Sequence, residues 1–415
     1  MKRFRFIIIL LFVVVSATLS NAQYNGLDLL DGKQKKEVQF EYINGFIMVK
    51  LIYGELLYMN FLLDTGASHN ILFKKNANDL LGYTYSDTIY VSGADVEAEM
   101  MALVSRNVPI QLVGTKMIMR DVIILNEDYI DLEKVLGRRV DGIIGGDFLR
   151  GLVLEINYRR KKIVIHNPIS YKSPNGYTKH DISLINYKPY LKANTSIETK
   201  SSQLQYLLDT GAALALLIHS NKVEDIPLPK NTIIGNLGTG LGGDLTGYVG
   251  LTDRLSFENY EFNNIVTSFQ DIDSSTLATK RIERDGIIGN VILSRFNIII
   301  DYMREKMYLK NIRELDEEFV YDKSGMLIYA SGKDLDQYFV KAVYPNTPAS
   351  EAGILPGDKI LKIGFWPLSF YSIESITSKL SGKPGKLIKM KLSRGEQNIK
   401  VRFRLRDLLK SSKQN

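Results

Sequence analysis

A duplicated segment constrains this chain more than any other feature of its sequence. Residues 61–68 read FLLDTGAS, and residues 206–213 read YLLDTGAA, identical at six of eight positions. A second segment, DGIIG, occurs at residues 141–145 and again at 285–289, so both halves keep nearly the same internal spacing. Repeats at a fixed interval are typical of chains built from copies of one structural unit. The sequence therefore predicts two lobes of the same fold.

The similarity continues beyond these motifs and has the pattern of strands. Residues 152–167 align without gaps on residues 296–311. Residues 37–63 form short runs in which apolar and polar residues alternate, separated by Asn44-Gly45 and Gly54, which favour hairpin turns. Each lobe is expected to be a mainly β barrel-like lobe, with one short helix after each DGIIG segment.

Composition limits the chemistry that such lobes can perform. The chain has 415 residues, of which 45% are hydrophobic and 24% charged, as in ordinary globular proteins. It has no cysteine, which excludes disulfides, zinc thiolates and cysteine nucleophiles. None of the four histidines is paired at the i, i+4 spacing of a helical metal site. Any hydrolysis must therefore use carboxylates or hydroxyls, and no cofactor or metal is expected.

The first 22 residues are expected to be a cleaved signal peptide. A basic start, Lys2 to Arg5, precedes an apolar run at residues 6–15 and small residues at 20–22. The alternative is an uncleaved membrane anchor, but the run is shorter than a bilayer span. Cleavage would lower the formal net charge from +7 to +4, and the remaining basic runs are scattered. We expect export to the periplasm or the medium, and no nucleic-acid partner.

The repeat places identical carboxylates, Asp64 and Asp209, at the ends of apolar segments. If the lobes pair about a pseudo-two-fold axis, the two side chains meet. Adjacent carboxyl groups cannot both ionise, so they share one proton and provide a base and an acid at the same pH. Such a pair can activate a water molecule for attack on an amide. The alternative is that both aspartates only stabilise turns.

These motifs resemble those of the aspartic peptidases. The DTGA form at Asp64 and Asp209, each followed by Ile-Ile-Gly, is closer to retroviral-type proteases than to pepsins, and the resemblance covers residues 37–312. It implies that the threonines interlock across the lobes and that the Ile-Ile-Gly segments lie beside the catalytic turns. The supporting residues so implied are Thr65, Gly66, Thr210, Gly211, Ile143, Ile144, Gly145, Ile287, Ile288 and Gly289.

The resemblance also implies a hairpin flap roughly 27 residues past each aspartate. The candidates are Ser92 and Gly93 in the first lobe, and Gly238 and Gly240 in the second. Tyr90, beside the first pair, is interpreted as a packing residue. The second segment also matches the dinucleotide pattern GxGxxG, but glycines and β-forming residues follow where a helix should begin, so this interpretation is rejected.

The last hundred residues form a different module. Strands are expected at 325–330, 337–344, 359–363, 386–392 and 397–404, with a short capped helix near 347–353 and another at 372–380. The run PASEAGILPGDKIL is similar to PDZ domains, with a resemblance covering residues 322–408. This implies that an extended or C-terminal peptide adds beside the second strand, with its terminal carboxylate on the backbone amides of the loop at Gly325, Met326, Leu327 and Ile328. The alternative is a stabilising appendage that binds nothing.

The sequence therefore predicts an exported aspartic endopeptidase of the bacterial type with a PDZ domain. Its expected partners are a polypeptide substrate and a PDZ peptide, and it is expected to be a monomer without a membrane anchor after signal cleavage. One alternative is an inactive peptide-binding protein of the envelope, since Ser68 is matched by Ala213 and His69 by Leu214. Another is a purely structural envelope protein. The expected domains are a signal peptide at 1–22, lobes at 23–172 and 173–312, a linker or solvated helix at 313–322, and the PDZ domain at 323–408.

Overall fold

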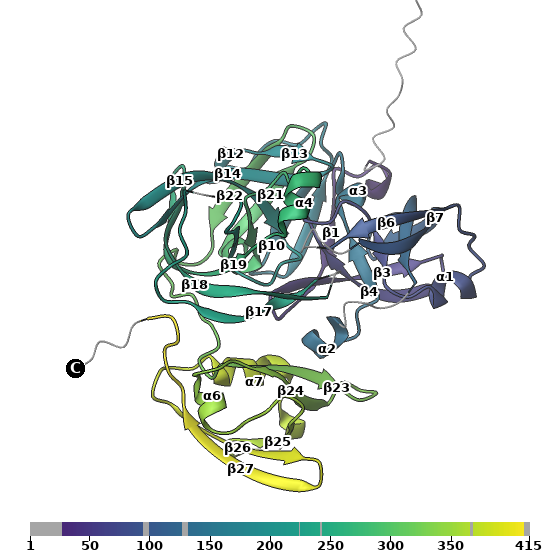
Figure 1. Cartoon of the computed structure of the whole chain (residues 1–415). Coiled ribbons are helices and arrows are strands. Elements are labelled where there is room, and N and C mark those ends of the chain that lie inside the picture. Colours follow the sequence, from purple (N-terminus) through teal and green to yellow (C-terminus); the bar gives the residue numbers. More distant parts are fainter. Residues whose placement is uncertain are drawn as a thin grey trace, which may run out of the picture.

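Strands dominate the structure, a computed structural model that describes residues 27–93, 99–126, 132–223, 225–240, 243–365 and 368–410. The mainly β class predicted from the sequence is confirmed (Figure 1). The expected signal peptide lies outside the described residues. Among the described residues, no helix is long and apolar enough to pass through a bilayer.

The two lobes contain eight-stranded sheets with the same order of strands. The lobe 1 sheet runs β2 (Glu41–Ile43), β3 (Phe46–Tyr53), β4 (Leu57–Leu63), β9 (Gly142–Ile144), β5 (Ile71–Leu72), β8 (Ile118–Leu125), β7 (Glu99–Leu112) and β6 (Asp87–Ser92). The lobe 2 sheet runs β13 (Ser183–Ile185), β14 (Lys188–Ile197), β15 (Lys200–Asp209), β20 (Gly286–Gly289), β16 (Leu216–His219), β19 (Tyr260–Gln270), β18 (Gly243–Phe257) and β17 (Ile233–Gly240). The duplicated sequence therefore folds twice into one topology.

A third sheet joins the lobes. Its order is β1 (Lys35–Gln39), β11 (Lys162–His166), β10 (Val153–Asn157), β21 (Phe296–Asp301), β22 (Lys306–Asn311) and β12 (Thr178–Asp181). The two halves meet at its centre, where β10 and β21 pair antiparallel with Ile156 opposite Ile298. Both strands come from the repeated segment downstream of DGIIG, so the repeat supplies the join as well as the lobes.

One continuous apolar core runs through both lobes and the shared sheet. It includes fully buried aromatic side chains from each half, among them Tyr53 in lobe 1 and Tyr206 in lobe 2. Because burial of apolar area is the main favourable contribution to folding, this common core makes the two lobes one cooperative unit. A chain without cysteine can be stabilised in this way.

The helices are short and lie between strands. The helix expected after each DGIIG segment is present, as α3 (Gly146–Leu149) and α5 (Asn290–Leu293). Others were not expected from the sequence: η1 (Leu27–Leu30), α1 (Asn76–Leu80), α2 (Leu132–Leu136) and α4 (Ser274–Thr279). Helices this short depend on tertiary contacts rather than on propensity, which explains why their sequences carry little signal.

The C-terminal domain has a five-stranded sheet in chain order. Its strands are β23 (Met326–Ser331), β24 (Gln337–Val343), β25 (Lys359–Ile363), β26 (Leu387–Arg394) and β27 (Gln397–Arg404). The short helix is α6 (Pro348–Glu351), with Thr347 and Ser350 forming a capping box, and the longer one is α7 (Ile373–Leu380), capped by Ser372. A further short turn, η2 (Leu368–Phe370), precedes α7. The domain has its own core, separate from that of the lobes.

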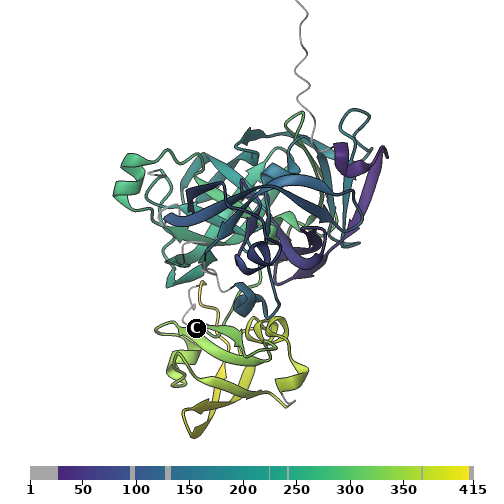
Figure 2. The same ribbon diagram turned by 90° about the vertical axis from the view of Figure 1, so that its right-hand side faces the viewer.

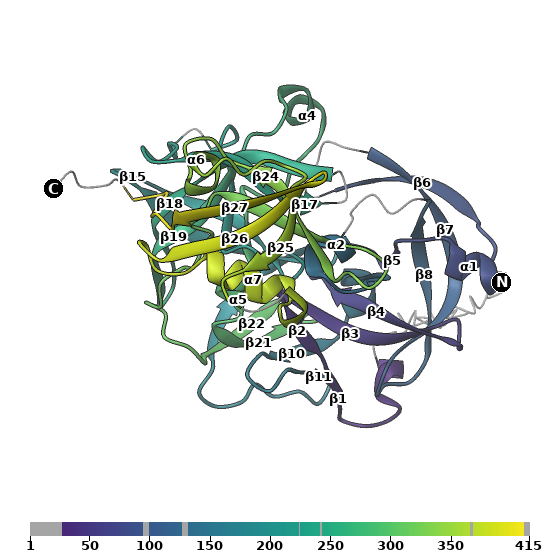
Figure 3. The same ribbon diagram turned by 90° about the horizontal axis from the view of Figure 1, so that it is seen from below.

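The C-terminal domain lies beneath the two lobes and contacts both (Figures 1 and 2). Helix α2 of lobe 1 packs against β23 and α7. Just beyond α2, a Cβ placed on Gly137 would lie 3.1 Å from the Ile373 side chain, and Gly137 has φ +61°. In lobe 2, a Cβ on Gly235 would lie 2.9 Å from the Tyr344 ring. The view from below in Figure 3 shows this domain mainly in front of lobe 2 and reaching α2 of lobe 1.

The segment at 313–322 contains no helix, so the solvated-helix interpretation is wrong. It is held to lobe 2 by Phe319, which is buried in the common core and lies under the Arg295 guanidinium at 4.0 Å. Arg295 also donates hydrogen bonds to the carbonyls of Leu315 and Glu317. These contacts explain why an acidic segment runs as an extended strap along lobe 2.

We predict that Asn290→Ala lowers the free energy of unfolding by about 2–4 kcal/mol. Asn290 is fully buried, and its Oδ1 accepts a hydrogen bond from the Tyr158 hydroxyl of lobe 1 at 2.6 Å. Its Nδ2 donates to the carbonyls of Gly45 and Thr210. The substitution leaves these groups unpaired in the core. Urea denaturation measures the change, with Asn194→Ala on an exposed position of β14 as control. Equal stability of the two variants would contradict the prediction.

Candidate active site

The two predicted aspartates occupy equivalent positions at the ends of strands. Asp64 follows β4, which runs parallel to β9, and Asp209 ends β15, which runs parallel to β20. In lobe 1 the Asp64 amide donates to the Ile144 carbonyl at 3.0 Å. Parallel neighbours bring each DTG turn and each Ile-Ile-Gly segment to the same edge of their sheet. The two edges face each other, and the carboxyl groups are within hydrogen-bonding distance.

The threonines after the aspartates form a crossed set of hydrogen bonds between the lobes. The Thr65 amide donates to Thr210 Oγ1 at 3.0 Å, and the Thr210 amide donates to Thr65 Oγ1 at 3.0 Å. Each hydroxyl then donates across the interface, Thr65 to the Leu208 carbonyl at 2.7 Å and Thr210 to the Leu63 carbonyl at 2.8 Å. Both threonines are fully buried, so these four bonds fix the distance between the lobes where the aspartates meet.

Glycine is required in both turns by the carboxyl group of the opposite lobe. A Cβ on Gly66 would lie 2.5 Å from Cγ of Asp209, and a Cβ on Gly211 would lie 2.3 Å from Cγ of Asp64. Any larger residue would push the carboxyl groups apart. The Gly66 and Gly211 amides also donate to their own aspartates, each at 2.7 Å.

The environment of Asp64 favours the protonated form of its carboxyl group. Burial raises the pKa of the Asp64 carboxyl well above its usual range, and the neighbouring Asp209 raises it further. The Gly66 and Ala67 amides, both bound to Asp64 Oδ1, lower this pKa by a smaller amount. The other Asp64 oxygen remains available to carry the proton.

The environment of the Asp209 carboxyl is more mixed. Burial raises the pKa of its carboxyl as well, but several groups act in the opposite direction. These are the hydrogen bond with Asp64, the Gly211 amide, and the positive charges of Arg284 and Lys188. The two cations belong to lobe 2, so the electrostatic environment of the pair is asymmetric although its backbone is symmetric.

The Ile-Ile-Gly segments lie directly behind the turns, as expected by resemblance. Ile143 and Ile144 belong to β9, and Ile287 and Ile288 to β20. A Cβ on Gly145 would meet the His69 carbonyl at 2.3 Å, and one on Gly289 would meet the Leu214 carbonyl at 2.4 Å. These glycines therefore let the loop after each aspartate pass close to the strand behind it.

The flap candidates lie on two hairpins. Ser92 ends β6 and Gly93 follows it, next to residues outside the described set, while Gly238 and Gly240 lie in β17 and pair with β18. The next described element after this glycine-rich segment is the strand β18, not a helix, which agrees with the rejection of a dinucleotide-binding site. Tyr90 is 70% exposed, so its interpretation as a packing residue is wrong. The strand that carries Tyr90, β6, is the edge strand of the lobe 1 sheet.

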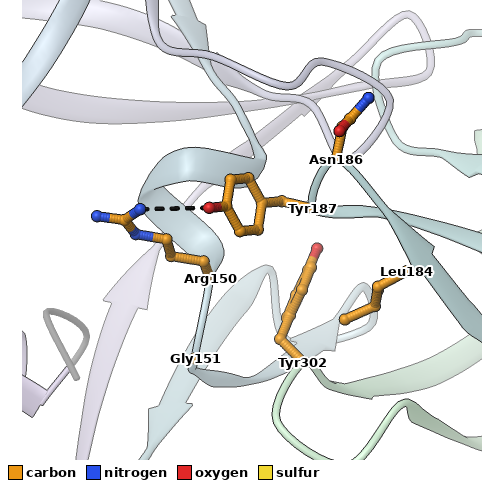
Figure 4. A pocket seen from close by; sticks show the side chains of 6 residues that line it. All are labelled: Arg150, Gly151, Leu184, Asn186, Tyr187 and Tyr302. Atoms are coloured by element: carbon orange, nitrogen blue, oxygen red, sulfur yellow. Dashed lines mark hydrogen bonds between the residues drawn. The ribbon is translucent and has the colours of Figure 1, made fainter. Parts of the chain in front are cut away.

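A cavity of about 410 Å³ lies at the junction of the lobes, lined by Arg150, Gly151, Leu184, Asn186, Tyr187 and Tyr302 (Figure 4). Tyr302 of lobe 2 is equivalent to Tyr158 of lobe 1. The Tyr158 hydroxyl donates to Asn290 of lobe 2, but the lobe 1 residue equivalent to Asn290 is Gly146, which has no side chain. The buried Tyr302 hydroxyl therefore has no hydrogen-bond partner in the described structure. Neither aspartate lines this cavity, which distinguishes it from the candidate active site.

The residues predicted to bind a peptide terminus lie at the edge of the C-terminal domain. Met326, Leu327 and Ile328 belong to β23, which pairs only with β24 among the described strands. The Gly325 amide donates to the Asp322 carboxylate at 2.7 Å. Burial raises the pKa of that carboxyl to about 6. A role for these residues in peptide binding stays a prediction.

Sequence inspection missed the basic residues near Asp209. Lys188 begins β14, and Arg284 is a buried residue just before the second DGIIG. Their signal was present, because both stand where the first lobe has an apolar residue. At Lys188 this difference between the lobes was hidden because the lobe 2 hairpin is three residues longer. Equivalent residues of the two lobes are 145 positions apart after the hairpin but 142 positions apart before it.

The comparisons with known proteins agree with this geometry. Residues 30–148 match the family model for an aspartyl protease, and residues 339–394 match the model for a PDZ domain. No curated protein matches the chain. The first model covers lobe 1, and the assignment of lobe 2 rests on its repeated sequence and strand order. The chain therefore carries an aspartyl protease domain and a PDZ domain, which confirms the resemblance found in the sequence.

We predict that Thr65→Val and Thr210→Val each lower the free energy of unfolding by about 1–3 kcal/mol, because each removes a donor and leaves the amide of the opposite threonine unpaired. Thermal and urea denaturation measure this change. The matched variants Thr65→Ser and Thr210→Ser keep the hydroxyl and should retain most of the stability. If valine and serine variants were equally stable, the crossed hydrogen bonds would not be what holds the lobes together.

Proposed function

We propose that this protein is an exported aspartic endopeptidase. One observation carries the proposal: a half-buried Asp64 and a buried Asp209, from equivalent turns, lie within hydrogen-bonding distance, and their environments favour a single shared proton. A pair in this state contains an acid and a base at the same pH, which amide hydrolysis by water requires.

The geometry supports a mechanism in which each aspartate has one task. The Asp209 carboxylate takes a proton from a water molecule as the water oxygen attacks the amide carbon. The Asp64 carboxyl gives its proton to the carbonyl oxygen, so the tetrahedral intermediate is a neutral diol. Collapse of the intermediate breaks the carbon–nitrogen bond as Asp209 gives its proton to the nitrogen and Asp64 takes a proton back from a hydroxyl of the diol. The dyad returns to its singly protonated state without a covalent intermediate.

The proposal extends to location and to the PDZ domain. Export rests on the amino-terminal pattern of basic, apolar and small residues. Peptide engagement rests on β23, an edge strand beside α7 that can accept an added strand. Helix α2 of lobe 1 packs against the same two elements, so a peptide on β23 would have to share this groove with α2 or displace it.

A second candidate function is peptide binding without cleavage. It is favoured by the divergence of the loops after the aspartates, where Ser68 and His69 have no equivalents at Ala213 and Leu214. It predicts binding of unfolded polypeptide with no turnover from pH 3 to 8.

We predict that Asp64→Asn and Asp209→Asn each reduce kcat for cleavage of an unfolded polypeptide by about 10²-fold or more, because each removes the acid or the base. Mass spectrometry of the products measures cleavage by the mature protein. Asp316→Asn, on an exposed position of the strap, is the matched control and should cleave like the wild type. Undiminished cleavage by either active-site variant would contradict the mechanism.

We predict a bell-shaped dependence of kcat/KM on pH. Activity should fall as the pH rises through the raised pKa of Asp64, because the dyad then loses its only proton. It should also fall as the pH drops through the pKa of Asp209, because both carboxyls are then protonated. Since burial raises both pKa values, the alkaline limb should lie above the ordinary range for aspartate. A profile that is flat from pH 3 to 8 would count against a shared proton.

A further inference from the structure

The positive charge of this protein is concentrated in its C-terminal domain. The chain has 53 lysines and arginines and 46 aspartates and glutamates, of which residues 323–408 contain 15 and 7, a formal net charge of +8. The other 38 basic and 39 acidic residues give the rest of the chain a net charge of −1. Basic runs that are scattered along the sequence therefore belong largely to one small domain.

One face of the sheet in this domain carries a block of these charges. The residues of β26 that alternate with Lys389 and Lys391 belong to the domain core, so both lysines lie on the outer face of the sheet. Strand pairing places Arg402 of β27 opposite Lys389, and Lys400 opposite Lys391. On the other side, Lys362 of β25 also pairs with Lys391. Three lysines thus form a row across three adjacent strands.

Like charges stand directly opposite each other on this face. All six of its basic side chains are exposed except Lys391, which is half-buried, and none forms an ion pair with an acidic residue of the described structure. Like charges in directly opposed positions destabilise a sheet. An anionic partner would remove this cost. We call the following residues the basic face: Lys362, Lys389, Lys391, Lys400, Arg402 and Arg404.

Acidic residues of the domain that lie nearby are engaged elsewhere. Asp358 binds Arg394 and Glu351 binds Arg406, both at 2.8 Å. The hairpin of β26 and β27 has one acidic residue of its own, Glu396, in its turn. One carboxylate does not neutralise the basic face, so a matching anion has to come from outside the chain.

Exposed apolar side chains accompany the cations. Phe365 is 80% exposed, and its ring centroid lies 5.5 Å from Nζ of Lys362. Leu387 is 42% exposed and lies opposite Arg404 on the outer face. Surfaces that combine basic and apolar side chains are typical of proteins that lie on anionic membranes. A nucleic acid would match the charges, but only aromatic rings stack on bases, so it would gain little from Leu387.

A cavity of about 430 Å³ lies at the β27 edge of the basic face, and its lining includes Arg402, Arg404, Arg406 and Glu351. Glu351 is the partner of Arg406, and Arg404 donates to the carbonyl of Gly385 at 2.9 Å, which leaves its charge in place. The cavity therefore has room for one anionic headgroup beside an otherwise flat surface.

The position of the sheet makes this face accessible. Strands β26 and β27 lie on the side of the domain away from the two lobes, and they are in front in the view from below (Figures 1 and 3). A flat surface can therefore approach them without meeting the lobes.

We propose that the basic face docks the protein on a membrane surface that contains anionic phospholipids. Its lysines and arginines would contact the headgroup phosphates, while Phe365 and Leu387 enter the interface between headgroups and acyl chains. The docking uses neither the aspartate pair nor the edge of β23, so it is independent of the proposed cleavage and of peptide binding.

The test is cosedimentation of the mature full-length protein with lipid vesicles. We expect the affinity for vesicles of phosphatidylcholine and phosphatidylglycerol in equal parts to exceed that for pure phosphatidylcholine by about tenfold or more, and to be lost at about 1 M salt, where the screening length is about 3 Å. The double variant Lys389→Gln/Arg402→Gln should bind the mixed vesicles about tenfold more weakly or worse. Phe365→Ser should weaken this binding by about threefold.

The matched control is Lys192→Gln/Lys200→Gln, which removes two exposed lysines from a lobe 2 hairpin and should bind like the wild type. The melting temperature of Lys389→Gln/Arg402→Gln should not fall, because the change relieves opposed charges, and this separates lost binding from misfolding. Equal binding to both kinds of vesicle, or undiminished binding by the double variant, would overturn the inference. So would a DNA duplex that binds as tightly as the mixed vesicles while Phe365→Ser has no effect.

Discussion

The crossed hydrogen bonds between Thr65 and Thr210 hold together two carboxyl groups that would repel each other if both were ionised. The geometry of the two aspartates depends on this contact. The glycines in both turns leave room for the opposite carboxyl group, and the Ile-Ile-Gly strands fix the turns from behind. Burial and this enforced proximity raise the pKa of Asp64. A structure that placed the same aspartates a few ångströms farther apart would have two ordinary carboxylates.

The threonine contact is small, and the rest of the interface supports it. The pairing of β10 with β21 makes one sheet from both halves, and the common core continues beneath it. The buried bond from Tyr158 to Asn290 adds a polar link between the lobes. Because the lobes share a sheet and a core, the position of the aspartates is set by the folding of the whole unit rather than by either half.

Much of this arrangement could be predicted from the sequence. The repeat identified two equivalent lobes and both aspartates, and alternating residues with hairpin signals indicated strands. The PDZ strands and both of its main helices were also expected where they occur. These features were accessible because local patterns encode them directly.

What could not be predicted depends on contacts between distant segments. Helix α2 has five residues and forms on lobe 1 against β23 and α7, far away in sequence. The 313–322 strap is extended because Phe319 enters the core, which its acidic neighbours do not indicate. The equivalence of Phe46 and Lys188 needs the strand register, since the hairpins differ in length. The raised pKa of Asp64 depends on burial and on Asp209, which only the fold brings together.

The apolar and basic surroundings of the dyad have a consequence for the direction of a bound polypeptide. A site with two-fold symmetry offers the same surfaces to a chain lying in either direction, so both orientations bind equally well. When two identical subunits build such a site, a substitution changes both halves at once, so the two orientations of the bound chain still bind equally well. Here both halves belong to one chain, so Phe46 can remain while its counterpart is Lys188. In the proposed peptidase, the two orientations of an extended chain across Asp64 and Asp209 would therefore differ in energy, and the site would distinguish the amino end from the carboxyl end.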